Sequence, residues 1–185
     1  MTRVAVFGGS FNPPHVSHVL ACALVLSVED VDHLLVVPAY RHPFAKALAP
    51  FEDRATMCEL AMAWIPRVEV SRVEGELGGE SRTLRTLESL SRAQPDWRLR
   101  LVIGADILTE APRWFGFDVI EKLAPPIVLG RAGFTGSAAA ALLPEVSSTQ
   151  VRAAIARGAW DEVEKLVPRE VLAYARARGL YAAPE

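Results

Sequence analysis

An α/β fold with one parallel sheet, covered by helices on both faces, is predicted by three features of this sequence. Five short apolar runs alternate with segments of helical periodicity, which is the pattern of strand–helix–strand units. Hydrophobic residues make up 51% of the chain and charged residues 23%, as in globular proteins. The 185 residues can bury one core, so we expect a single domain over residues 1–185.

The predicted strands are short apolar runs that end close to a glycine, a proline or a polar residue. We place them at residues 4–7, 33–37, 67–71, 98–103 and 126–130. The fourth strand is expected beside the first, near the centre of the sheet.

The predicted helices connect these strands. They are a helix that starts after Pro14 and runs to residue 28, then 51–64, 82–93, 116–123, 150–157 and 168–178. Ser81 is the expected N-cap of the third helix, and residues 74–80, with three glycines, are an expected loop. The pattern predicts a Rossmann-like, doubly wound parallel sheet of about five strands with a small C-terminal helical segment.

Residues 4–18, VAVFGGSFNPPHVSH, join a predicted strand to a predicted helix through two glycines. Gly8 and Gly9 let the backbone turn and approach a ligand without a Cβ in the way. His15 and His18 stand three apart at the helix start, where free backbone N–H groups attract anions. The pattern indicates a phosphate site, and structural histidines or half of a metal site are the alternatives.

A second helix start carries hydroxyl groups and a cation. Ser147, Ser148 and Thr149 precede a helical segment, and Arg152 lies one turn into it. Together they suit a second anion site, with a plain N-cap as the commoner alternative. This SSTxxR motif belongs to the C-terminal helical part, residues 146–185.

Further candidates follow the predicted strands, where ligands bind in open α/β sheets. Lys46 belongs to a basic loop after the second strand. Asp106 follows the fourth strand and suits ribose hydroxyls, a metal ion or a helix cap equally well. Trp114 and Phe115 suit either the core or contact with a planar ring. We interpret residues 131–145 as a mobile linker or lid.

Composition and charge narrow the range of partners. The net charge is -2 and the pI about 6.1, which argues against a broad nucleic-acid surface. The longest apolar run, residues 19–28, is too short to span a bilayer, and the first residues form a strand rather than a signal peptide. Cys22 and Cys58 suit reduced core positions. We expect a cytoplasmic protein that binds neither nucleic acid nor membrane.

The motifs at both ends of the chain resemble the signatures of one nucleotidyltransferase superfamily, HxGH near the N-terminus and S/T-x-x-R near the C-terminus. GGSFNPPHVSH at 8–18 and SSTQVR at 147–152 carry the resemblance. Within that superfamily the chain most resembles the bacterial nicotinate-nucleotide adenylyltransferase family. Further matches are Pro38 with Pro43 and Lys46, RATM at 54–57, SRT at 81–83, GAD at 104–106, Trp114, Ile127 with Val128 and Arg131, and RGLY at 178–181.

This resemblance implies transfer of AMP from ATP to nicotinate mononucleotide, with release of pyrophosphate and no covalent intermediate. It implies Mg²⁺ as a cofactor held by the ATP phosphates, with no metal site on the protein, and a homo-oligomer is compatible with it. Such a transfer depends on positioning and charge neutralisation more than on proton chemistry.

The resemblance also implies roles for residues of this chain. His15 and His18 would hold phosphate oxygens in the transition state, and Arg152 would grip the leaving pyrophosphate. The other implied ATP-binding residues are Gly8, Gly9, Ser10, Phe11, Lys46, Gly104, Asp106, Arg131, Ser148 and Thr149. The implied mononucleotide pocket consists of Trp114, stacked on the pyridine ring, with Phe115 and Thr83. Backbone N–H groups would select the nicotinate carboxylate.

Two residues depart from the family pattern. Ser17 stands where the family has glycine between its histidines, and Arg82 where it usually has tyrosine. The added Cβ and hydroxyl of Ser17 predict modestly weaker ATP binding. For Arg82 we expect exposure to solvent rather than contact with a substrate phosphate.

Three other functions remain as alternatives. The first is a sister nucleotidyltransferase that uses nicotinamide mononucleotide, phosphopantetheine or a small alcohol phosphate. Against the last two, the phosphopantetheine family has threonine at the place of His15, and the chain lacks the R-T-x-G that usually precedes the cytidylyltransferase C-terminal motif. The second is a nucleotide-binding protein whose catalysis is impaired by Ser17. The third is a zinc protein that uses His15, His18 and either His42 or Asp106.

Overall fold

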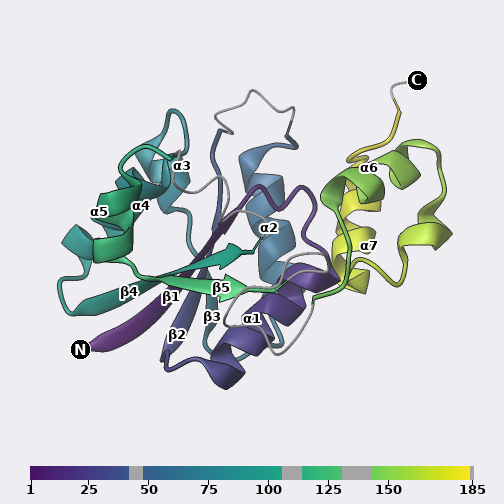
Figure 1. Cartoon of the computed structure of the whole chain (residues 1–185). Coiled ribbons are helices and arrows are strands. Elements are labelled where there is room, and N and C mark those ends of the chain that lie inside the picture. Colours follow the sequence, from purple (N-terminus) through teal and green to yellow (C-terminus); the bar gives the residue numbers. More distant parts are fainter. Residues whose placement is uncertain (42–47, 106–113, 131–142, 184–185) are drawn as a thin grey trace.

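The computed structural model describes residues 1–41, 48–105, 114–130 and 143–183, which form an α/β fold around one sheet (Figure 1). All neighbouring strands are parallel, in the order β3-β2-β1-β4-β5. The strands are β1 (Thr2–Gly9), β2 (His33–Pro38), β3 (Val68–Val70), β4 (Trp97–Gly104) and β5 (Pro126–Leu129). The predicted parallel sheet is confirmed.

The first strand, β1, occupies the centre of the sheet. Val4 pairs with His33 of β2 on one side and with Leu99 of β4 on the other, so β4 lies beside β1 as predicted. The chain moves outward from β1 to β2 and β3, then returns to β4 and β5 on the opposite side. In open α/β sheets such a reversal of direction opens a ligand-binding crevice at the carboxyl ends of the central strands.

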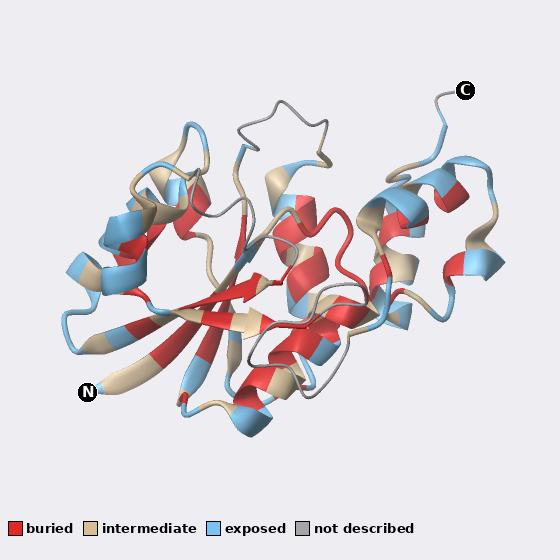
Figure 2. Cartoon of the chain, in the orientation of Figure 1, coloured by how far each residue is buried: buried red, intermediate tan, exposed pale blue. Residues whose placement is uncertain are grey.

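Helices cover both faces of the sheet. They are α1 (Val16–Val28), α2 (Phe51–Met62), α3 (Val73–Leu77), α4 (Thr83–Ala93), α5 (Phe117–Leu123), α6 (Ser148–Ala156), the short 3₁₀ helix η2 (Trp160–Val163) and α7 (Arg169–Ala177). Ala5 of β1 faces the core formed with α1, α2, α6 and α7, whereas Val4 and Val6 face a second core formed with α4 and α5. This alternation is the period-two pattern of a strand buried on both sides. Figure 2 shows the resulting band of buried residues through the sheet.

The predicted loop over residues 74–80 is partly wrong, because residues 73–77 form the short helix α3. Its glycine does not mark a turn. A Cβ at Gly75 would lie 2.6 Å from Cε1 of Phe51, so any larger residue here would force the Phe51 ring to move.

The predicted N-cap at Ser81 is also wrong, since Arg82 occupies the N-cap position of α4 and makes no side-chain cap. The Ser81 hydroxyl instead accepts a hydrogen bond from the Arg41 backbone N–H at 3.3 Å, and the Ser81 N–H donates to the Arg41 carbonyl at 3.0 Å. The Ser81 hydroxyl therefore binds the backbone of Arg41, 40 residues away in sequence, instead of capping α4. Other boundaries differ by one or two residues, which is the usual uncertainty of helix and strand ends.

No helix within the described ranges combines the length and the apolar character that crossing a bilayer requires.

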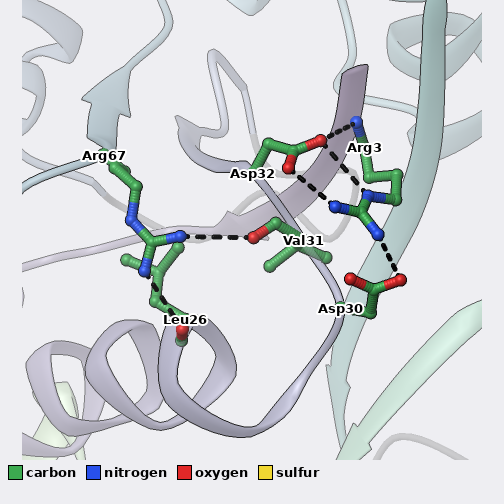
Figure 3. Close-up of polar contacts among 6 residues, drawn as sticks. All are labelled: Arg3, Leu26, Asp30, Val31, Asp32 and Arg67. Carbon is green, nitrogen blue, oxygen red and sulfur yellow. Dashed lines mark hydrogen bonds and ion pairs between the residues drawn. The ribbon is translucent and has the colours of Figure 1, made fainter. Parts of the chain in front are cut away.

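A cluster of polar side chains lies at the amino ends of the strands, opposite their carboxyl ends, and connects neighbouring segments there (Figure 3). Arg3 of β1 donates to both carboxylate oxygens of Asp32, at 3.2 and 2.8 Å, and also pairs with Asp30. Nearby, the Arg67 guanidinium donates to the carbonyls of Leu26 and Val31, near the end of α1. Cations are favourable at a helix C-terminus because they complement its dipole.

This cluster predicts an acid-sensitive contribution to stability. Hydrogen bonds from Arg3 hold the pKa of the Asp32 carboxyl below its usual range. A lowered carboxyl pKa stabilises the fold above the pKa of the unfolded state, about 4, and this contribution is lost as the pH falls. The variant Asp32→Asn should therefore have a lower Tm than the wild type at pH 7, and the difference should begin to shrink at about pH 4 and disappear only as the pH falls through the lowered pKa of Asp32. A pH-independent difference would contradict this assignment.

Candidate active site

The first part of the site is the end of β1 and the loop that follows it. Gly8 is exposed, and a Cβ there would meet no other atom within 4 Å, so the backbone is accessible at the centre of the sheet. Gly9 differs, since its Cβ would lie 3.1 Å from the ring of buried Phe11. The loop backbone enters the left-handed region at Phe11, where φ is 46°, and the Asn12–Pro13 peptide bond is cis. Gly8 is thus the position open to a ligand.

The two histidines lie together at the start of α1. His15 is the N-cap residue and His18 is the third residue of the helix. Their rings are stacked with centroids 3.7 Å apart, and the His15 backbone N–H donates to Nδ1 of His18 at 3.1 Å. Because Nδ1 accepts, the proton of a neutral His18 ring is on Nε2, which can donate to an anion.

The second helix start, that of α6, is built with a separate capping residue. The Ser147 hydroxyl accepts from the Gln150 backbone N–H at 3.2 Å, and the Gln150 side chain returns to the Ser147 N–H at 3.2 Å. This is a capping box. Ser147 is therefore a cap, whereas the next two hydroxyls, of Ser148 and Thr149, are not needed for this box.

The two helix starts meet at the loop before His15. Arg152 donates from Nη1 to the Asn12 carbonyl at 2.7 Å, and the Ser148 hydroxyl donates to the Pro13 carbonyl at 2.9 Å. A second nitrogen of Arg152 lies 3.3 Å from the Thr149 hydroxyl. Contacts across 135 and 140 residues of sequence thus place the SSTxxR motif against the segment that carries the histidine pair.

Arg54 of α2 also binds this loop, through the carbonyl of Ser10. Arg54 was not assigned to the site from the sequence. It is 1% exposed and donates to the carbonyls of Ala49, Ser10 and Tyr40 at 2.9, 2.9 and 3.3 Å. Burial lowers the pKa of its guanidinium. An arginine within a run of buried helix positions is the signal that could have revealed it, because buried arginine needs several acceptors.

The residues predicted to form the pyridine pocket lie near the start of α4, on the side of the second core. Trp114 packs edge to face with Phe117, with centroids 6.4 Å apart, and contacts the second core. Phe115 is 72% exposed, and the Arg82 guanidinium lies 5.6 Å from the centre of its ring. The expectation that Arg82 faces solvent agrees with its half-exposed side chain, which also pairs with Glu80. Thr83 is the first residue of α4.

Several predicted site residues cannot be placed. Lys46, Asp106 and Arg131 lie outside the described residues, as does most of the segment 131–145. Gly104 ends β4 and pairs with Leu129 of β5. Within the described ranges no three histidine, cysteine or acidic side chains come together as a metal site, and His42 of the zinc alternative lies outside these ranges.

Ser17, which replaces the glycine of the family motif, makes a long-range contact. It is 4% exposed, and its hydroxyl donates to the Pro144 carbonyl at 2.7 Å. Pro144 stands three residues before the N-cap of α6. The serine thus connects the first turn of α1 to the segment that leads into the SSTxxR motif.

The variant Ser17→Gly has two expected results. Its free energy of unfolding should fall by about 1–2 kcal/mol, because a buried hydrogen bond is lost and glycine is a poor helix residue. The KM for ATP should fall modestly, because the substitution removes the Cβ that is predicted to weaken ATP binding. Thermal unfolding tests the first result and steady-state kinetics the second; an unchanged or higher KM would contradict the second.

A doubly wound parallel sheet with two helix starts that meet at the loop after its central strand is an arrangement that suits the binding of a nucleotide. The chain belongs to the cytidylyltransferase-like family, whose profile matches residues 6–154, and within it to the nicotinate-nucleotide adenylyltransferases. A probable nicotinate-nucleotide adenylyltransferase of Anaeromyxobacter dehalogenans is 46% identical over 97% of this chain and 96% of its own, and one of Myxococcus xanthus is 43% identical over 97% and 94%. This confirms the family resemblance.

A solved structure of the same fold supports the architecture. Nicotinic acid mononucleotide adenylyltransferase of Plasmodium falciparum, complexed with NaAD, superposes with a TM-score of 0.84 at 16% identity and covers 98% of both chains.

Proposed function

We propose that this enzyme transfers AMP from ATP to nicotinate mononucleotide, giving deamido-NAD and pyrophosphate in NAD biosynthesis. A phosphate oxygen of the mononucleotide attacks the α-phosphorus of ATP. The bond from that phosphorus to the oxygen it shares with the β-phosphate breaks, and pyrophosphate leaves. The observation that carries the proposal is the contact of Arg152 and Ser148 with the loop before His15.

The first helix start would hold the reacting phosphates. Nε2–H of His18 and the imidazole of His15 would donate to phosphate oxygens as negative charge builds up in the transition state. The exposed backbone of Gly8, followed by Ser10 and Phe11, would lie along the nucleotides. Preorganised donors of this kind stabilise the transition state without needing to reorient.

The second helix start would hold the leaving group. Arg152 is anchored by one nitrogen to Asn12, and its other donors, with the Thr149 hydroxyl, would bind the β- and γ-phosphates. The Ser148 hydroxyl would join them by exchanging its bond to the Pro13 carbonyl for one to a phosphate oxygen. Charge-assisted bonds from a guanidinium to phosphate are strong and directional. Lys46, Asp106 and Arg131 stay in the proposal as ATP contacts on the family resemblance alone.

Mg²⁺ would enter with ATP, coordinated by the phosphates. The groups at the two helix starts are hydroxyls, imidazoles and a guanidinium, which suit oxyanions rather than a hard cation. The ion would neutralise charge on the phosphates. The pyridine ring would lie against Trp114, with Phe115 and Thr83 beside it.

One assay tests the proposal against its alternatives. Purified enzyme with ATP and Mg²⁺ is given nicotinate mononucleotide, its amide, phosphopantetheine or a small alcohol phosphate, and both dinucleotide and pyrophosphate are followed. Fastest turnover is expected with nicotinate mononucleotide, and EDTA should abolish it. Faster turnover of another acceptor would favour a sister enzyme. Tight ATP binding without pyrophosphate release from any acceptor would favour a protein with impaired catalysis.

A further inference from the structure

Asn12 is the junction of four segments that are distant in sequence. It is 1% exposed, and its side-chain Oδ1 accepts from the Ala49 backbone N–H at 3.1 Å and from the Tyr181 hydroxyl at 2.8 Å. Its backbone carbonyl accepts from Arg152 at 2.7 Å. The side chain of Asn12 is therefore fixed by the C-terminal segment, while its backbone fixes Arg152.

The C-terminal segment is folded back to reach this position. After α7 ends, the backbone enters the left-handed region at Gly179 and again at Tyr181, with φ of 62° and 66°. The Leu180 N–H donates to the Ala175 carbonyl at 2.9 Å, and Leu180 and Tyr181 pack on the core. A left-handed backbone at a non-glycine residue is unfavourable, so the surrounding contacts must maintain it.

The Tyr181 hydroxyl is a stable donor. Burial raises the pKa of the phenol, so it stays protonated throughout the physiological range. The α7 helix that precedes it is itself tied to α2, where Asp53 accepts from the Tyr174 hydroxyl at 2.8 Å and from Arg178 at 3.1 Å.

We propose that Tyr181 is a positioning residue for ATP binding: its hydroxyl fixes Asn12, and Asn12 in turn aims Arg152 at the triphosphate. The inference rests on the proposed function for the identity of the ligand. Loss of the hydroxyl leaves Oδ1 of Asn12 without one of its donors, so the loop carbonyl that anchors Arg152 is held less firmly. The guanidinium then has to be ordered when ATP binds, which weakens binding.

The test is the variant Tyr181→Phe, with Tyr174→Phe as its matched control. Both remove one tyrosine hydroxyl that donates at 2.8 Å from the C-terminal part of the chain, but only Tyr181 reaches Asn12. Tyr181→Phe should raise the Kd of ATP, measured by calorimetry, and the KM of ATP by roughly three- to tenfold. The KM of nicotinate mononucleotide should change less than twofold, about the smallest shift expected from a lost hydrogen bond. Tyr174→Phe should lower the Tm and leave the Kd of ATP unchanged.

A double-mutant cycle then asks whether the effect passes through Arg152. In an Arg152→Ala background, Tyr181→Phe should change the Kd of ATP by less than about twofold, because there is no guanidinium left to aim. Additive effects, or equal changes in ATP affinity for the Tyr181 and Tyr174 variants, would overturn the inference while leaving the proposed function intact. Conversely, a wild type that binds ATP but makes no dinucleotide would contradict the proposed function alone.

Discussion

Replacing Arg152 with alanine is expected to lower kcat/KM for ATP by roughly a hundred- to a thousandfold, the usual cost of removing one preorganised donor to developing negative charge. The guanidinium is anchored at the carbonyl of Asn12, three residues before His15, so it would meet the leaving pyrophosphate in a fixed orientation. Arg152→Lys keeps the charge but loses the forked geometry, and should recover only part of the activity.

Arg157 offers the matched control for this experiment. It lies at the C-terminal end of the same helix, is exposed and pairs with Glu162 at 2.8 Å. Arg157→Ala should change kcat/KM by less than about twofold, since exposed ion pairs contribute little. Similar kinetics for the Arg152 and Arg157 variants would contradict the role assigned to the SSTxxR motif. Unfolding curves for both variants confirm that the comparison is made on folded protein.

Replacing Arg54 with methionine is expected to lower the free energy of unfolding by about 2–4 kcal/mol. The substitution keeps much of the side-chain volume but leaves three carbonyls, of Ser10, Tyr40 and Ala49, without their donor. Because Ser10 belongs to the loop over the candidate site, ATP affinity should fall as well. Arg54→Lys should behave almost as badly, since one ammonium group cannot reach three acceptors in a plane.

The comparison for this variant is Arg72→Met. Arg72 forms ion pairs with Glu52 and Glu59 of α2, but its side chain is half-exposed. Screening by solvent limits such pairs to about 1 kcal/mol or less. Urea unfolding of both variants measures the difference, and equal losses would contradict the stabilising role assigned to the three buried hydrogen bonds of Arg54.

The sheet could be predicted from the sequence because parallel strands that are buried on both faces consist of continuous runs of apolar residues. The run around Val4 and the run around Leu101 identify two such strands, and their adjacency follows the usual winding of α/β folds. The three glycines of residues 74–80 led to the wrong prediction of a loop. Gly75 lies in a helix, and the absence of a Cβ there leaves room for the Phe51 ring. That reason depends on a residue 24 positions away and is invisible in the local pattern.

Only part of the candidate site could be predicted from the sequence. His15, His18 and Arg152 stand at helix starts, and helix starts can be read from capping residues and prolines. Arg54 and Tyr181 could not be assigned roles from the sequence, because their partners are brought to them by folding. Arg54 binds three backbone carbonyls, and Tyr181 binds the amide oxygen of Asn12. No residue type in the sequence marks such acceptors.

The bond between the His15 N–H and Nδ1 of His18 has a consequence for metal selectivity. A neutral imidazole that coordinates zinc or nickel through Nε2 must carry its proton on Nδ1, and that nitrogen could then no longer accept from the backbone. Ligation would therefore cost the first turn of α1 one of its hydrogen bonds. The hydrogen bond that leaves the proton of the His18 ring on Nε2, where it can bind an oxyanion, therefore disfavours coordination of a transition metal by that nitrogen.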